Sequence, residues 1–112
     1  MGSLYLLLEV DKNGEEYFKI GITKRNIDSR ISELQTGNPN KISLLKSYDS
    51  KNYKQIEKWL HTTYANQKSE TDNEWFSLDD DQVINFINSC KKADEVMSVL
   101  KESNPFFELP TN

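Results

Sequence analysis

The sequence predicts an α+β protein, an α/β sandwich in which a small, mainly antiparallel three-stranded sheet is flanked by three or four helices. Two strand-like segments joined by turn residues open the chain, and the later segments carry apolar residues at helical spacing. Its 112 residues, 36% hydrophobic and 29% charged, suffice for one core. We therefore expect a single domain over residues 1–112, with a core at about 3–90 and a C-terminal helix and tail at 91–112.

The first two strands form a predicted hairpin. Residues 4–10 alternate, so that Leu4, Leu6, Leu8 and Val10 share one face. The turn that follows contains Asn13-Gly14, a pair suited to positive φ, and leads into a second strand over residues 16–23. If the register permits, Tyr5 and Lys19 share the opposite, exposed face of the sheet.

A helix and a third strand come next. The helix is predicted to begin after Asn26 and to end at Gly37, with Ile27, Ile31 and Leu34 at helical spacing. Arg30 lies beside this apolar stripe, where its stem can pack while its guanidinium reaches the adjacent sheet face. After a turn at 38–40, residues 42–48 are predicted to form a strand that joins the hairpin.

The second half of the chain is predicted to be helical. An amphipathic helix spans about 52–64 and places Glu57 and His61, at i and i+4, on one flank. Residues 77–80 resemble a capping box in front of a third helix that extends to Cys90. A fourth helix is expected over about 93–102, and the sequence leaves open whether the tail from Phe106 onwards packs on the domain.

Charge and cysteine content narrow the function classes. The net charge of −4 is unusual for a nucleic-acid-binding protein, but the first 56 residues hold nine basic against seven acidic residues, so a locally basic face is possible. The lone Cys90 cannot form an internal disulfide, and we see neither a signal peptide nor a membrane-spanning segment. We expect an intracellular, cytoplasmic protein that does not bind membranes.

Several separated segments occur along the chain in a defined order. They are Ser3-Leu4-Tyr5, Lys19-Ile20-Gly21-Ile22-Thr23, Arg30, Leu34-Gln35-Thr36-Gly37-Asn38-Pro39, Glu57, Leu60-His61 and Glu74-Trp75-Phe76. In this order they resemble the GIY-YIG nuclease superfamily, in its branch of small phage and bacterial members. The first motif departs from the superfamily pattern because its glycine is absent, and the second because Lys19 replaces a tyrosine.

This resemblance implies a metal-dependent endonuclease that hydrolyses phosphodiester bonds in DNA, in a bacterial or phage-infected cell. Glu57 would bind Mg²⁺ or Mn²⁺, leaving other positions to water and substrate oxygens. Arg30 would clamp a non-bridging phosphate oxygen with its planar fork. Tyr5 is the candidate base, since a nearby cation such as Lys19 would lower its ordinary pKa of about 10.

Other roles stay open at this stage. Lys19 could orient the attacking water, and His61 could orient Glu57, contact phosphate or assist proton transfer. Tyr17 and Tyr64 are reserve bases, and Trp75 and Phe76 are expected to be core anchors rather than stacking platforms. We expect Lys24, Arg25 and Lys41 to contact nucleic acid.

A rival interpretation is a nucleic-acid-binding or regulatory protein that retains the fold without catalysis. The acidic second half, the missing motif glycine and Lys19 favour it. Structural zinc at Glu57 and His61 is disfavoured because the chain has only one His and one Cys. The sequence leaves open DNA or RNA, duplex, branched or single strands, and a monomer or a weak homodimer.

Overall fold

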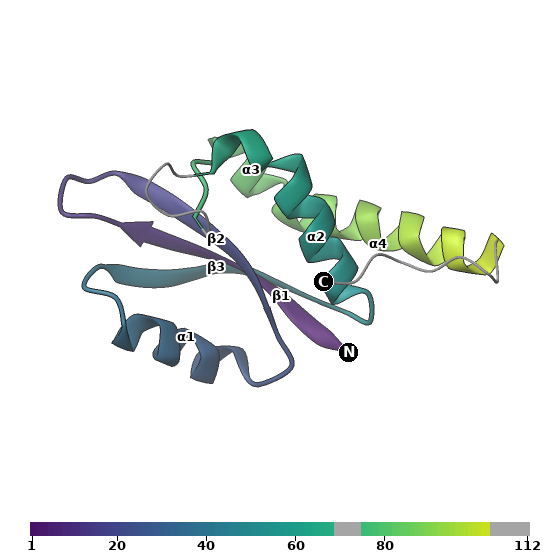
Figure 1. The fold of residues 1–112 in the computed structure, drawn as a ribbon, viewed down its shortest axis with the longest axis horizontal. Helices are drawn as coiled ribbons and strands as arrows, with labels where there is room; N and C mark the ends of the chain where they lie inside the picture. The colour runs from purple at the N-terminus through teal and green to yellow at the C-terminus, as the bar shows by residue number, and fades with distance from the viewer. Residues whose placement is uncertain (69–74, 104–112) are drawn as a thin grey trace.

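The computed structural model describes residues 1–68 and 75–103, and it has the predicted α+β architecture (Figure 1). Three antiparallel strands, β1 (Gly2–Val10), β2 (Glu16–Thr23) and β3 (Lys41–Ser50), form one sheet in the order β2-β1-β3. One helix covers one face of this sheet and the later helices lie on the other face. The predicted fold class is therefore confirmed.

The β1–β2 hairpin follows from its turn and its alternation. The carboxylate of Asp11 accepts hydrogen bonds from the backbone N–H groups of Asn13 and Glu15, at 2.8 and 3.0 Å, and Gly14 takes the positive φ of 81° that the turn requires. This turn sets a register in which Tyr5 lies opposite Gly21 and Leu7 lies opposite Lys19. The register decides which side chains meet at the site described below.

The two faces of the sheet build two apolar clusters. On one face, Leu4, Leu6 and Ile20 pack against α2 (Tyr53–Thr63) and α4 (Phe86–Ser103). On the other face, a smaller cluster is completed by half-buried residues of α1 (Ile27–Thr36). That second cluster contains Tyr5, Leu7, Ile42 and Trp75.

The prediction that Tyr5 lies on an exposed face was wrong. Its side chain is only 1% exposed, because α1 and Trp75 cover the face of the sheet that we expected to be open to solvent. A single amphipathic strand pattern does not show that a second layer covers its other face.

Gln35 fastens α1 to the start of β3. Its side-chain amide donates to the backbone carbonyls of Asn38 and Asn40, at 3.2 and 2.8 Å, and its carbonyl accepts the N–H of Ile42 at 2.8 Å. At the other end of α1, the Asn26 side chain caps the helix by accepting the N–H of Ser29. The helix that presents Arg30 is thus held at both ends.

The boundary between the last two helices differs from the prediction. The short α3 (Asp80–Ile84) ends at Asn85, and α4 then runs without interruption through Cys90, where we expected a helix to end. Nothing in the segment after Cys90 breaks a helix, whereas Asn85 caps α3 and the buried Phe86 starts the next helix. The capping box is also shifted, since it uses Asp79 and Gln82 rather than Ser77 and Asp80.

Some predicted features lie outside the described residues, namely Glu74 and the tail from Phe106 onwards. Between α2 and this gap, a 3₁₀ turn spans Ala65–Gln67. Among the helices in residues 1–68 and 75–103, none combines the length and the apolar character needed to cross a membrane.

A polar network fixes α4 against the turn between β3 and α2. The carboxylate of Asp94 accepts hydrogen bonds from Tyr48, Ser50 and Asn52, at 2.7 to 2.8 Å. Asn52 is fully buried, and its side-chain Oδ1 accepts a hydrogen bond from the Lys101 ammonium at 2.8 Å. Burial by itself would raise the pKa of Asp94, but the three hydrogen bonds, led by that from Asn52, lower it below its ordinary value.

Asp94→Ala is expected to lower the free energy of unfolding by about 2–4 kcal/mol, because Tyr48, Ser50 and the buried Asn52 all lose the carboxylate that accepts their hydrogen bonds. The amide of Asn52 keeps only its longer hydrogen bond to Ser98, at 3.3 Å. Since the pKa of Asp94 is lowered in the folded state, its stabilisation should be present near neutral pH and disappear as the pH falls through that pKa. Urea denaturation at several pH values measures both effects. Glu95→Ala, an exposed neighbour on α4, is the control; equal losses in both variants would contradict the assignment.

Candidate active site

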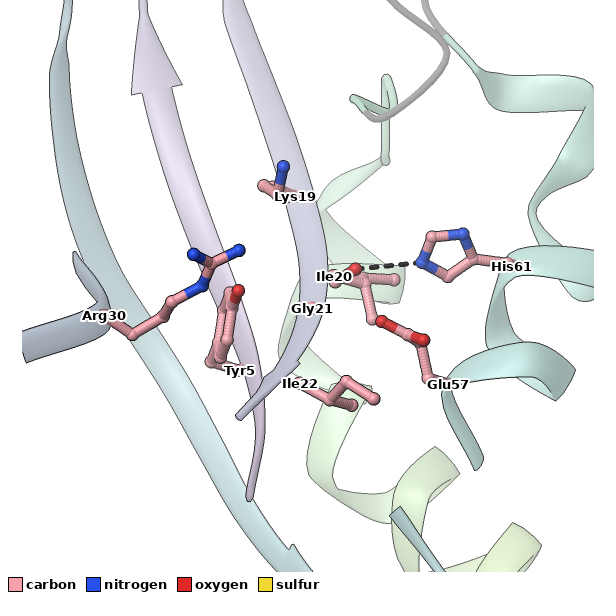
Figure 2. A pocket seen from close by; sticks show the side chains of 8 residues that line it. All are labelled: Tyr5, Lys19, Ile20, Gly21, Ile22, Arg30, Glu57 and His61. Atoms are coloured by element: carbon pink, nitrogen blue, oxygen red, sulfur yellow. Dashed lines mark hydrogen bonds between the residues drawn. The ribbon is translucent and has the colours of Figure 1, made fainter. Parts of the chain in front are cut away.

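The five residues predicted to be catalytic line one pocket of about 230 Å³ (Figure 2). The pocket lies around β2, with α1 on one side and α2 on the other, and Ile20, Gly21 and Ile22 of β2 also line it. The catalytic candidates in its lining are Tyr5, Lys19, Arg30, Glu57 and His61.

Gly21 makes room for the ring of Tyr5. The two residues are cross-strand partners, and a Cβ atom placed on Gly21 would lie 2.5 Å from Cζ and 2.6 Å from Cε1 of Tyr5. Real Cβ atoms do not approach other atoms so closely. The glycine of the second motif is therefore needed for space, because it lets the Tyr5 ring of the first motif pack against β2 and line the pocket.

Arg30 brings its guanidinium from α1 to the hydroxyl of Tyr5 (Figure 2). The interaction with Tyr5 is the largest cause of a raised pKa of Arg30, and Glu33 adds to it. The cation beside Tyr5 is thus Arg30 rather than Lys19, whose ammonium lies 5.6 Å from the centre of the Trp75 ring. From the sequence we named Lys19 as an example of a cation near Tyr5, and we expected the Arg30 guanidinium to reach the adjacent sheet face.

Glu33 is a residue of this region that our sequence reasoning missed. Its carboxylate pairs with both guanidinium groups of the region, that of Arg25 through two contacts of 2.7 Å and that of Arg30 at 3.3 Å. The pair with Arg25 is the largest cause of a lowered pKa of Glu33. The i, i+3 spacing of Arg30 and Glu33 was the available signal.

Glu57 presents a half-buried carboxylate from α2. Burial raises the pKa of Glu57, while His61 and Lys19 act in the opposite direction. Within residues 1–68 and 75–103, the Glu57 carboxylate has no hydrogen-bond partner. A carboxylate that has lost part of its hydration and accepts no hydrogen bond is suited to bind a cation. The cation would then replace the stabilisation that the carboxylate loses with its water.

His61 is held by β2 and the core. Its Nε2 lies 2.9 Å from the backbone carbonyl of Ile20, and its ring makes an edge contact with Phe76 at 5.1 Å between ring centres. Because a carbonyl oxygen only accepts, we assign the hydrogen to Nε2, which leaves Nδ1 as the acceptor of the neutral ring. His61 therefore does not use Nε2 to orient Glu57, an option that the sequence had left open.

The other predicted residues do not line this pocket. Lys24 and Arg25 follow β2 near its site end, and Arg25 is paired with Glu33. Lys41 pairs with Val10 at the opposite end of the sheet, about 16 Å along β1 from Tyr5 at 3.3 Å per residue. The predicted nucleic-acid contacts are thus spread along the sheet rather than gathered at the pocket.

The reserve tyrosines and the aromatic pair have other roles. The hydroxyl of Tyr17 donates to Glu15 at 2.6 Å, and this bond is the largest cause of a raised pKa, which suits a base poorly. Tyr64, Trp75 and Phe76 are buried, and Phe76 also pairs with Phe18 through backbone hydrogen bonds of 2.7 and 2.8 Å. Trp75 and Phe76 are core anchors, as predicted.

The comparisons with known proteins match residues 2–91 to the T5orf172 domain, a span that includes the whole pocket. The chain belongs to the T5orf172 domain family. This domain is phage-derived and is found in proteins associated with GIY-YIG-like and HNH-like nucleases, although the GIY-YIG family itself does not match directly. Membership of the T5orf172 family points to a nuclease-related or DNA-binding role. No curated protein and no solved structure matches the chain significantly.

Proposed function

We propose that this T5orf172 domain is a metal-dependent endonuclease of the GIY-YIG type that hydrolyses phosphodiester bonds in DNA. The observation that supports this most is the convergence of Tyr5, Arg30 and Glu57 on one pocket of about 230 Å³ from a strand and two separate helices. A tyrosine hydroxyl, a bidentate cation and a carboxylate are the groups that phosphodiester hydrolysis needs close together.

Arg30 would hold the scissile phosphate. Its planar guanidinium can donate two parallel hydrogen bonds to non-bridging oxygens, and about a third of its side chain remains exposed to a ligand. A phosphate bound there would lie next to the Tyr5 hydroxyl, since Arg30 already contacts that group. Binding of substrate would then compete with Glu33 for the same guanidinium.

Two groups could accept the proton of the attacking water. Tyr5 lies nearer to the phosphate position at Arg30, because the Arg30 guanidinium contacts the Tyr5 hydroxyl. His61 offers Nδ1 of a ring that is already oriented through Nε2. A general base must lie within hydrogen-bond reach of its water, and both groups line the pocket in which that water would be held.

Glu57 would hold Mg²⁺ or Mn²⁺. No group of three or more His, Cys, Asp and Glu side chains suited to a metal occurs in the described part of the chain, so one carboxylate with water and substrate oxygens is the expected ligand set. Such an ion, when bound, stabilises the negative charge that develops on the leaving oxygen. The half-buried Glu57 carboxylate, which has no hydrogen-bond donor among residues 1–68 and 75–103, is the feature that fits this role.

A second candidate function is DNA binding or regulation without cleavage. It is favoured by Lys19 at the position of the motif tyrosine and by Glu33, which pairs with both nearby arginines. In this case DNA would still bind, and no divalent cation would support cleavage.

Nicking of supercoiled plasmid with Mg²⁺ or Mn²⁺ distinguishes the two functions. We expect the parent to nick DNA, and Glu57→Ala and Arg30→Ala each to reduce the rate by about 100-fold or more, as removal of a group that stabilises transition-state charge does. Glu95→Ala and Lys92→Ala, exposed residues of α4, are the matched charge controls. Cleavage that survives both site substitutions would refute the assigned roles, and binding without cleavage would favour the second function.

Each copy of the pocket accommodates one scissile phosphate, so a monomer is expected to nick one strand. Cutting of both strands would need two events or a weak homodimer. The ratio of nicked to linear plasmid at increasing protein concentration separates these possibilities.

A further inference from the structure

A second hollow adjoins the catalytic pocket along the outer side of α2. It has a volume of about 380 Å³ and is lined by Glu57, Lys58, His61, Thr62, Ala65 and Lys68; we call it the α2 groove. Glu57 and His61 belong to both hollows, so the α2 groove begins where the catalytic pocket ends.

Helix geometry explains how residues of α2 line both hollows. Glu57 and His61 lie one turn apart on one row of the helix surface, and Lys58 and Thr62 form the adjacent row. A ligand that leaves the catalytic pocket across the first row therefore meets Lys58 on the second. The hydroxyl of Thr62 donates to the backbone carbonyl of Lys58 at 3.0 Å, which leaves the lysines as the donors of the groove.

Lys68 closes the far end of the groove from a fixed position. The preceding residue, Gln67, is tied to Ser77 by hydrogen bonds at its backbone carbonyl, 2.7 Å, and at its side-chain amide, 3.0 Å. Lys68 itself forms a β-bridge with Phe76. Because the backbone at Lys68 is already held in this way, binding of a ligand there does not have to order it.

The charge of the combined hollows differs from that of the whole chain. Two cationic side chains, Lys58 and Lys68, and one carboxylate, Glu57, line the α2 groove, whereas the chain carries a net charge of −4. Lys19 and Arg30 line the adjoining pocket, where Glu33 pairs with Arg30. No acidic residue within 1–68 and 75–103 forms an ion pair with Lys58 or Lys68. An elongated cationic track that starts at a hydrolytic pocket suits a chain of phosphates.

We infer that the α2 groove binds the DNA backbone next to the scissile phosphate, with Lys58 and Lys68 contacting adjoining phosphates of the same strand. This inference rests on the proposed endonuclease function. The residues predicted from the sequence to contact nucleic acid, Lys24, Arg25 and Lys41, line neither hollow. Lys58 and Lys68 would supply phosphate contacts beside the pocket instead.

The test compares Lys58→Ala/Lys68→Ala with Lys91→Ala/Lys92→Ala, which removes the same charge from exposed positions of α4. Binding of a fluorescent DNA duplex is measured without divalent cations at several salt concentrations, and plasmid nicking is measured with Mg²⁺. We expect the groove variant to bind on the order of tenfold more weakly and to lose about 1–2 from the slope of log affinity against log salt. Its KM should rise while kcat at saturating DNA stays within about twofold.

Three outcomes are informative in different ways. Equal affinity and slope in the groove variant and the α4 control, with active parent protein, would overturn the groove assignment and leave the endonuclease function standing. A parent that neither binds nor cleaves DNA would overturn both. A parent that binds without cleaving would refute only the catalytic function, since the salt slope still tests the groove. Thermal melting checks that both variants fold.

Discussion

Gly21→Ala is expected to reduce DNA cleavage by about 100-fold or more and to lower the free energy of unfolding by about 1–3 kcal/mol. The added methyl group would occupy the space of the Tyr5 ring, which lies 2.5 Å from that position at Cζ. The ring has little room to retreat, because Tyr5 is 1% exposed and packs in the second apolar cluster. Plasmid nicking and urea denaturation measure the two effects.

Gly37→Ala is the matched control for this substitution. Nothing lies within 4 Å of a Cβ at Gly37, and its φ of −91° is accessible to alanine. We expect unchanged activity and a stability that is equal or higher by up to about 1 kcal/mol, since alanine restricts the unfolded chain. Equal losses from both glycine substitutions would contradict the steric explanation.

Tyr5→Leu in the Gly21→Ala background distinguishes the steric effect of the alanine from the role of the Tyr5 hydroxyl in cleavage. The smaller side chain relieves the collision, so the double variant should recover part of the lost unfolding free energy while cleavage stays low. Recovery of cleavage without Tyr5 would show that this tyrosine has no role in the reaction.

Glu57→Gln is expected to lower cleavage by about 100-fold or more and, at neutral pH without divalent cations, to make the protein more stable. Burial raises the pKa of Glu57, so the folded state binds its proton more tightly than the unfolded state and the ionised carboxylate opposes folding. Glutamine has nearly the same shape and carries no charge. The gain in unfolding free energy should be largest above the folded-state pKa and should vanish as the pH falls below the ordinary value of 4.5.

The same variant tests the metal site without reference to activity. Mg²⁺ or Mn²⁺ should raise the melting temperature of the parent and leave that of Glu57→Gln unchanged, because an ion that binds only the folded state stabilises it. Glu95→Gln on α4 should behave like the parent throughout. A gain in stability that is independent of pH, or an equal response of both proteins to the cation, would contradict this role of Glu57.

Local patterns were sufficient for most of the secondary structure. Alternation and the Asn13-Gly14 turn predicted the hairpin, and its second strand was predicted with the observed ends. The break between α3 and α4 was misplaced because Asn85 was not recognised as a cap, and β3 proved longer than predicted, Lys41–Ser50. Such boundaries depend on a few hydrogen bonds at the ends of elements, which have a weak signal in the sequence.

The candidate site depended more on tertiary structure. Motif order selected Tyr5, Lys19, Arg30, Glu57 and His61, and the structure brings all five to one pocket. Their mutual arrangement did not follow from the motifs: Arg30 rather than Lys19 lies beside Tyr5, Glu33 competes for Arg30, and Lys58 and Lys68 extend the cationic surface. These contacts join residues from different elements, and no periodicity within one segment encodes them.

The sequence by itself determined the elements, the fold class and the residue types available for phosphodiester chemistry, because periodicity, turn residues and motif order are local properties of the chain. Only the tertiary structure decided which of those residues share a pocket and which are neutralised or buried. That outcome is set by strand register and by the docking of α1 and α2 on the two sides of β2, where Tyr5 meets Gly21 and the carboxylate of Glu57 loses part of its water.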